Sequence, residues 1–61
     1  MIRLTTPKGD ILVNEDRIIA VTPVEDDKGI VVLGESEVLI DPLGPIRVSV
    51  SIGMLEEMLN G

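Results

Sequence analysis

The chain has 61 residues, with eleven acidic and five basic side chains for a net charge of −6, and it contains no His, Cys, Phe, Tyr or Trp. These absences exclude disulfides, zinc sites built on Cys or His, His-activated nucleophiles and aromatic stacking of bases. A chain of this length is predicted to form one domain, residues 1–61, with too little interior for a catalytic pocket. We therefore expect no enzymatic activity, no metal site and no cofactor.

The apolar residues are almost entirely aliphatic, with Val, Ile and Leu supplying 23 of 27. The core is therefore expected to consist of many medium-sized side chains, with no large residue at its centre. No apolar run approaches the roughly 18 residues of a membrane span, and the start of the chain lacks the apolar region of a signal peptide. These features predict a soluble, cytoplasmic protein without a membrane span.

The first expected elements form a β-hairpin. Residues 2–5 alternate between apolar and polar side chains, which is typical of a half-buried strand. Residues 7–10 contain Pro and Gly in a turn-like order, and the apolar residues 11–13 then form the returning strand. The hairpin ends at a polar corner, where the side chains of Asn14 and Asp16 can bond to nearby backbone amides.

Three more strands are predicted in the middle of the chain, over residues 17–24, 30–33 and 37–40. The acidic, Gly-containing residues 25–29 connect the first two of these as a tight turn. Pro23 has no N–H to donate, so the end of its strand is expected at a sheet edge or a bulge.

The end of the chain changes its hydrophobic period. Residues 46–52 alternate strictly and predict the clearest strand of the chain. The following apolar residues lie at helical spacing: Met54, Leu55, Met58 and Leu59. A helix this short is unstable alone in water, so it must dock either on its own domain or on a partner.

Together these elements predict a mainly-β fold, a small curved antiparallel sheet or barrel of five to six short strands with a short C-terminal helix. Residues 11–13, 30–33 and 38–40 are apolar at consecutive positions, which indicates strands covered on both faces. One small domain has too few layers to provide this cover. The pattern therefore predicts a homo-oligomer that works through protein–protein contacts.

Two polar groups are candidates for function. The acidic residues 25–27 could bind a hard cation, but they lack the spaced ligand pattern of a calcium loop and are better interpreted as a hydrated hairpin tip. Asn14, Asp16 and Arg17 could form a recognition corner or a capped turn. The predicted partner-binding residues are thus this corner and the C-terminal apolar group, with methionines suited to adaptable contacts.

Nucleic-acid binding is disfavoured by the acidic charge, because phosphate contacts depend on Lys and Arg. As an alternative, Arg3, Arg17 and Arg47 could gather on one face of an oligomer and bind RNA or DNA. A further alternative is that the acidic surface mimics nucleic acid and blocks a basic partner protein.

The chain resembles the small flagellar proteins of the FlbD (swarming motility) family in short apolar motifs. The matching positions are Met1, Ile2, Leu4, Thr5, Gly9, Asn14, Asp16 and Ile18, with residues 30–34 and 55–59. This resemblance implies an accessory factor of flagellar motility that acts by protein contact without catalysis.

A second resemblance is to the carbon storage regulators, which are small RNA-binding dimers. It lies in Ile2, Leu4 and Thr5 and in residues 48–50 before a Glu-bearing helix. Where that family carries a basic residue after this strand, the chain has Ser51 and Ile52. We therefore expect a shared small-β shape without a shared RNA-binding function.

Overall fold

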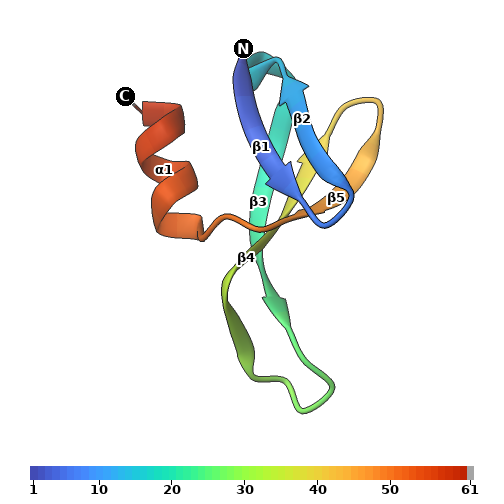
Figure 1. Cartoon of the computed structure of the whole chain (residues 1–61), viewed down its shortest axis with the longest axis vertical. Helices are drawn as coiled ribbons and strands as arrows, with labels where there is room; N and C mark the ends of the chain where they lie inside the picture. Colours follow the sequence, from blue (N-terminus) through green and yellow to red (C-terminus); the bar gives the residue numbers. More distant parts are fainter. Residues whose placement is uncertain (61) are drawn as a thin grey trace.

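The computed structural model describes residues 1–60 as five β-strands, one short 3₁₀ turn and one α-helix (Figure 1). The elements in chain order are β1 (Ile2–Thr6), β2 (Gly9–Val13), η1 (Glu15–Arg17), β3 (Ile18–Glu25), β4 (Val31–Ile40), β5 (Gly44–Val48) and α1 (Ile52–Asn60). The predicted mainly-β fold with a short C-terminal helix is confirmed.

The predicted N-terminal hairpin is confirmed as β1 and β2, which pair antiparallel. Leu4 faces Ile11 across the pair, and this face points into the protein, whereas Leu12 lies on the opposite, exposed face. The connecting turn is closed by the hydroxyl of Thr6, which accepts a hydrogen bond from the backbone N–H of Lys8 at 3.2 Å.

The other three strands form an antiparallel sheet in the order β3-β4-β5. Val38 lies on the central strand, opposite Val21 on one side and Ile46 on the other. The two sheets meet where the backbone N–H of Ser49, directly after β5, donates to the carbonyl of Thr5 in β1 at 2.7 Å. They do not close into a barrel, and the strands form two open antiparallel sheets where one curved sheet or barrel was predicted.

The core lies between the two sheets and the helix. Its buried hydrophobic members come from β1, β2, β4, β5 and α1: Leu4, Val13, Val38, Ile40, Val48 and Leu55. Burial of Leu55 explains why a helix of only nine residues is stable here, because its apolar side docks on the sheets.

The predicted boundaries in the middle of the chain were wrong at one place. Residues 30–33 and 37–40 were expected to form separate strands, but Val31–Ile40 is one strand. Gly34 does not form a turn between two strands. It has a positive φ of 80° and lies in a bulge of β4, after which the strand continues.

The predicted last strand was too long. It ends at Val48, and Ile52 begins α1, although the alternation of residues 46–52 predicted a strand throughout. Two contacts accompany this change: the carbonyl of Val50 accepts a hydrogen bond from the side chain of Ser36, and the hydroxyl of Ser51 accepts one from the backbone N–H of Met54 at 3.2 Å, which caps the start of the helix. The helix then starts with the N–H of Leu55 donating to the carbonyl of Ser51 at 3.0 Å.

Within residues 1–60, the structure contains no helix with the length and apolar character needed to cross a bilayer.

Candidate interaction surface

Aliphatic side chains are more numerous on the surface of the described chain than in its core. Only six hydrophobic residues are buried. Ten large hydrophobic residues are exposed: Met1, Leu12, Ile19, Ile30, Val31, Leu33, Leu39, Leu43, Ile52 and Met54. Seven further hydrophobic residues are partly buried against the core. Singly exposed apolar residues are ordinary, but ten exposed large ones in so small a domain mark a surface suited to binding another protein.

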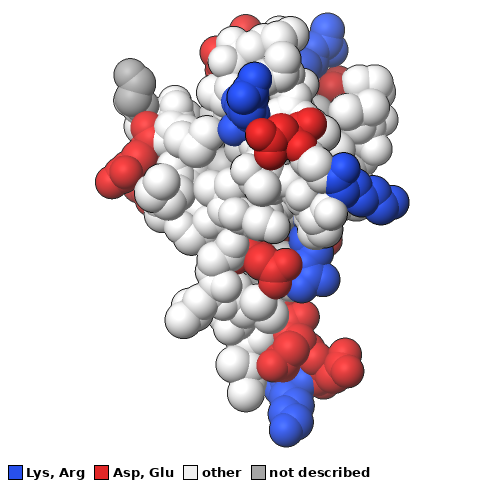
Figure 2. Space-filling view, in the orientation of Figure 1, with Lys and Arg blue, Asp and Glu red and all other residues white. Residues whose placement is uncertain are grey.

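Three of the exposed aliphatic side chains lie close together in the sequence, on a hairpin that projects from the protein. We call residues 24–35, where β3 and β4 extend beyond the rest of the protein, the arm (Figure 1). Ile30 is 60% exposed, Val31 48% and Leu33 90%. In Figure 2 uncharged atoms occupy one edge of the arm, and the charged side chains occupy the other edge and the tip. The arm therefore presents an apolar edge to the solvent.

The backbone of the arm is also incompletely paired. The register pairs Pro23 with Ser36 and Glu25 with Val31, so between these pairs β3 contributes one residue and β4 contributes the four residues 32–35. The pairing of β4 with β5 begins only at Ser36. Residues 32–35 consequently have no register partner in either neighbouring strand, although they lie within β4.

The tip of the arm is an ordered turn. One carboxylate oxygen of Asp26 accepts hydrogen bonds from the backbone N–H groups of Lys28 at 2.8 Å and Ile30 at 3.0 Å. The backbone N–H of Gly29 donates to the backbone carbonyl of Asp26 at 3.0 Å. Gly29 has a positive φ of 79°, a conformation that glycine adopts readily. This carboxylate is thus engaged in the turn, and no three acidic side chains of the described residues are arranged to hold a metal ion.

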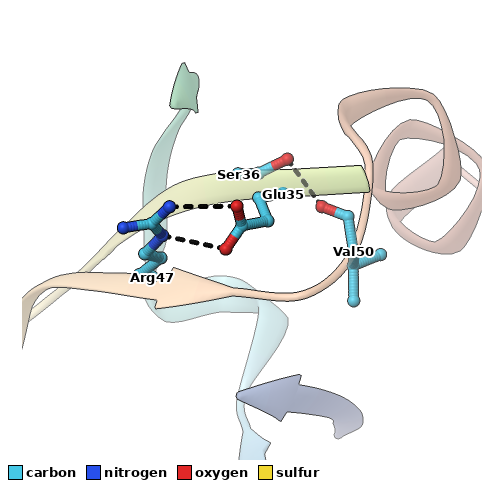
Figure 3. A network of polar contacts seen from close by, with 4 residues as sticks. All are labelled: Glu35, Ser36, Arg47 and Val50. Atoms are coloured by element: carbon cyan, nitrogen blue, oxygen red, sulfur yellow. Dashed lines mark hydrogen bonds and ion pairs between the residues drawn. The ribbon is translucent and has the colours of Figure 1, made fainter. Parts of the chain in front are cut away.

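The base of the arm is fixed by polar contacts (Figure 3). The guanidinium of Arg47 donates to both carboxylate oxygens of Glu35, at 3.0 and 2.9 Å, and this contact raises the pKa of Arg47. The hydroxyl of the fully buried Ser36 donates to the carbonyl of Val50 at 2.7 Å. The arm is therefore anchored both to β5 and to the segment that leads into α1.

The predicted recognition corner has the geometry of a capped turn. The side-chain oxygen of Asn14 accepts a hydrogen bond from the backbone N–H of Asp16 at 3.0 Å, and the backbone carbonyl of Asn14 accepts one from the backbone N–H of Arg17 at 2.9 Å. The side chain of Arg17 lies 3.7 Å from the carboxylate of Asp41. These contacts support a structural role for the corner, and its role in partner binding stays a prediction.

The carboxylate of the neighbouring Glu15 interacts both with a backbone N–H group and with the N-terminal ammonium. A hydrogen bond from the backbone N–H of Glu15 is the main cause of a lowered pKa of its carboxyl group, and the N-terminal ammonium, 3.2 Å away, lowers it further.

The predicted C-terminal contact residues divide between the interior and the surface. Leu55 is 1% exposed and belongs to the core, whereas Met58 and Leu59 are half-buried and Met54 is 55% exposed. A groove of about 260 Å³ remains open between α1 and Val21 of β3. The helix therefore docks on its own domain through Leu55, and Met54 is the member of the group that points outward.

The three arginines of the nucleic-acid alternative lie on different elements. Arg3 is on β1 opposite Leu12, Arg17 ends η1 beside Asp41, and Arg47 is on β5 bonded to Glu35. On the face shown in Figure 2, acidic and basic side chains alternate across the surface. Carboxylates beside two of the three arginines reduce the positive charge available for phosphate.

The aliphatic residues of the arm were not among the site residues predicted from the sequence. The signal that could have identified them is the run of four consecutive apolar residues, 30–33, directly before Gly34. That run predicted a strand buried on both of its faces, but it did not indicate that the segment projects from the domain.

Comparison with known protein families, with characterised proteins and with solved structures finds no match. The resemblance of the sequence to the FlbD family consequently stays a prediction.

Proposed function

We propose that this protein is a non-enzymatic protein–protein interaction module that works as a homo-oligomer. The observation that carries this proposal is the excess of exposed over buried large aliphatic residues in the described chain. Removing apolar surface from water is worth about 25 cal/mol per Å². Association of copies would therefore gain free energy by burying the aliphatic side chains that are exposed in the single chain.

A non-enzymatic role is supported by the structural hydrogen bond of the buried Ser36 hydroxyl. Ser36 is the only buried polar residue among residues 1–60, and its hydroxyl donates to the carbonyl of Val50. A catalytic nucleophile would need a free hydroxyl beside a base, whereas this hydroxyl is committed to joining the arm to the segment before α1.

The cellular role that we propose follows the sequence resemblance to the FlbD family, an accessory factor of bacterial motility located in the cytoplasm. Deletion of its gene should reduce swarming of the host cells without changing their growth rate. Normal swarming after deletion would contradict this role while leaving the proposed oligomer untouched.

The oligomeric state is tested by light scattering coupled to size exclusion and by sedimentation equilibrium. Protein concentrations from about 1 µM to about 1 mM cover association free energies of about −8 to −4 kcal/mol. Because the chain has no Trp or Tyr, refractive index replaces absorbance for detection. We expect masses that are multiples of 6.6 kDa. A constant mass of 6.6 kDa at every concentration would refute the proposal.

A further inference from the structure

The unpaired segment of the arm has the properties of a strand that accepts another strand. Residues 32–35 lack a register partner on both sides, and Ile30, Val31 and Leu33 beside or within this segment are exposed. A strand with free backbone groups and apolar side chains is a template for pairing with a further chain.

We propose that the occupant is a second copy of this chain. Residues 31–33 of the two copies lie antiparallel about a two-fold axis, and the tip of each arm lies against the first turn of α1 in the other copy. This inference rests on the proposed homo-oligomeric function and names its interface.

The sequence of the segment suits self-pairing. A two-fold axis brings each patch against its own copy, so a charged residue near the axis would face a like charge. Residues 30–34 carry no charged side chain, and all but Gly34 are aliphatic. Residues 30–34 of two copies therefore bring no like charges together at the axis, and each copy gains a neighbouring strand on the side of β4 where β5 pairs only from Ser36 onward.

The contact with α1 follows from the anchoring of the arm. In an antiparallel pair, the tip of one arm lies beside the base of the other. The base is tied to the segment before α1 through the hydrogen bond from Ser36 to Val50. In Figure 1 the first turn of α1 is the end of the helix nearest to the arm. Ile52 and Met54 are exposed in this turn, so they offer apolar cover to the partner's Ile30.

At the base of the arm, which the acidic tip of the other copy approaches, Glu35 and Glu37 are partly neutralised by Arg47, which bonds to Glu35 and lies opposite Glu37 in β5. The tip carries the acidic residues 25–27, and the first turn of α1 contains no acidic side chain. The N-terminal end of a helix is its positive end, which attracts rather than repels carboxylates. Glu56 and Glu57 lie beyond the first turn.

The buried area of a stable dimer is the reason for including both the pairing of residues 31–33 and the contact between the tip and α1. A standard interface buries about 800 Å² of each partner, whereas the whole chain exposes 4351 Å². About 800 Å² is close to a fifth of that exposed surface, so the interface must extend beyond the three residues 31–33 at the axis. Adding the first turn of α1 and its reciprocal contact extends the interface along the whole arm.

Cysteine cross-linking provides a direct test, because the chain has no cysteine of its own. We expect Val32→Cys, which lies opposite its own copy at the two-fold axis, to form a disulfide-linked dimer under mild oxidation. Leu43→Cys, in the turn between β4 and β5, is the matched control, since Leu43 is also exposed, at 67%. It should remain monomeric on a non-reducing gel.

A charge substitution gives an independent measurement. Leu33→Asp should weaken the association of the full chain by about tenfold or more, as expected for a central contact residue, whereas Leu43→Asp should leave it unchanged. Circular dichroism checks that both variants are folded, which the high exposure of both side chains favours.

The outcomes separate this inference from the proposed function. A wild-type chain that is monomeric at every concentration would overturn both. A wild-type oligomer that Leu33→Asp does not weaken, and in which Val32→Cys does not cross-link, would overturn the arm interface alone. Loss of association in Leu43→Asp but not in Leu33→Asp would do the same.

Discussion

Replacement of Leu55 by alanine tests whether the C-terminal helix is an integral part of the domain. Leu55 is the one helix residue that is fully buried, and it packs with Val38, Val48 and Leu4 in the core. A helix of nine residues has little stability of its own, so this side chain is expected to hold it in place.

The size of the effect follows from the atoms removed. Leu→Ala deletes three carbon atoms, which at about 0.8 kcal/mol each gives about 2.4 kcal/mol before any cavity cost. Buried Leu→Ala substitutions cost about 2–5 kcal/mol in total. The open groove beside α1 allows the helix to move inward and shrink the cavity, so we expect about 2–3 kcal/mol. A 61-residue domain has a total stability of roughly 3–9 kcal/mol.

Urea unfolding followed by far-ultraviolet circular dichroism measures this loss at one fixed protein concentration, so that association contributes equally. With a slope of about 1 kcal/mol per molar urea, the midpoint should fall by about 2–3 M. Glu57→Ala, on the exposed side of the same helix, is the control and should change the stability by less than about 0.5 kcal/mol. A loss for Leu55→Ala as small as that of the control would refute the docking of α1 in the core.

Three further predictions concern the arm, the helix and the N-terminal corner. Ser36→Ala leaves the carbonyl of Val50 without its donor and should cost about 1–3 kcal/mol in urea unfolding; an unchanged midpoint would contradict this hydrogen bond. Gly34→Ala should destabilise by about 1–2 kcal/mol because of its positive φ, whereas Gly53→Ala, which meets no atom within 4 Å in the helix, should stabilise by about 0.5–1 kcal/mol. Shifts of the same sign for these two variants would argue against the bulge. The lowered pKa of Glu15 implies a stability contribution that is complete above the ordinary glutamate pKa and is lost as the pH falls through the lowered value. Glu15→Gln should therefore weaken the acid dependence of stability, and titration of Glu15 at the ordinary pKa by nuclear magnetic resonance would contradict the contact.

The predicted elements that are confirmed depend on local patterns. The alternation of Ile2 and Leu4, the Pro and Gly in the turn, and the apolar residues around Ile11 predict the first hairpin without reference to the rest of the chain. The spacing of Leu55 and its neighbours likewise predicts the helix. These signals are local because the period of the apolar residues reflects the local backbone geometry.

The errors lie where distant contacts decide. Ile52 continues the alternation of a strand but begins a helix, where Ser36, fourteen residues before Val50, donates to the carbonyl of Val50 and Ser51 caps the first turn. Gly34 has the residue type of a turn but lies in a bulge, since β4 resumes pairing with both neighbours at Ser36. The capping Ser51 stands next to Ile52 in the sequence, but the distant partner Ser36 and the strands that pair again with β4 at Ser36 do not.

The sequence by itself determined a small acidic domain with an aliphatic interior, β-strands broken at Pro and Gly, and a docked terminal helix, because composition and spacing act on nearby residues. Only the tertiary structure decided which aliphatic side chains are covered. Leu4 and Leu33 are the same residue type, each in a β-strand, yet one is fully buried and the other 90% exposed. That difference arises because strand pairing brings β1 over the core, whereas residues 32–35 lie in a bulge of the β3–β4 pair and beyond the end of the pairing with β5.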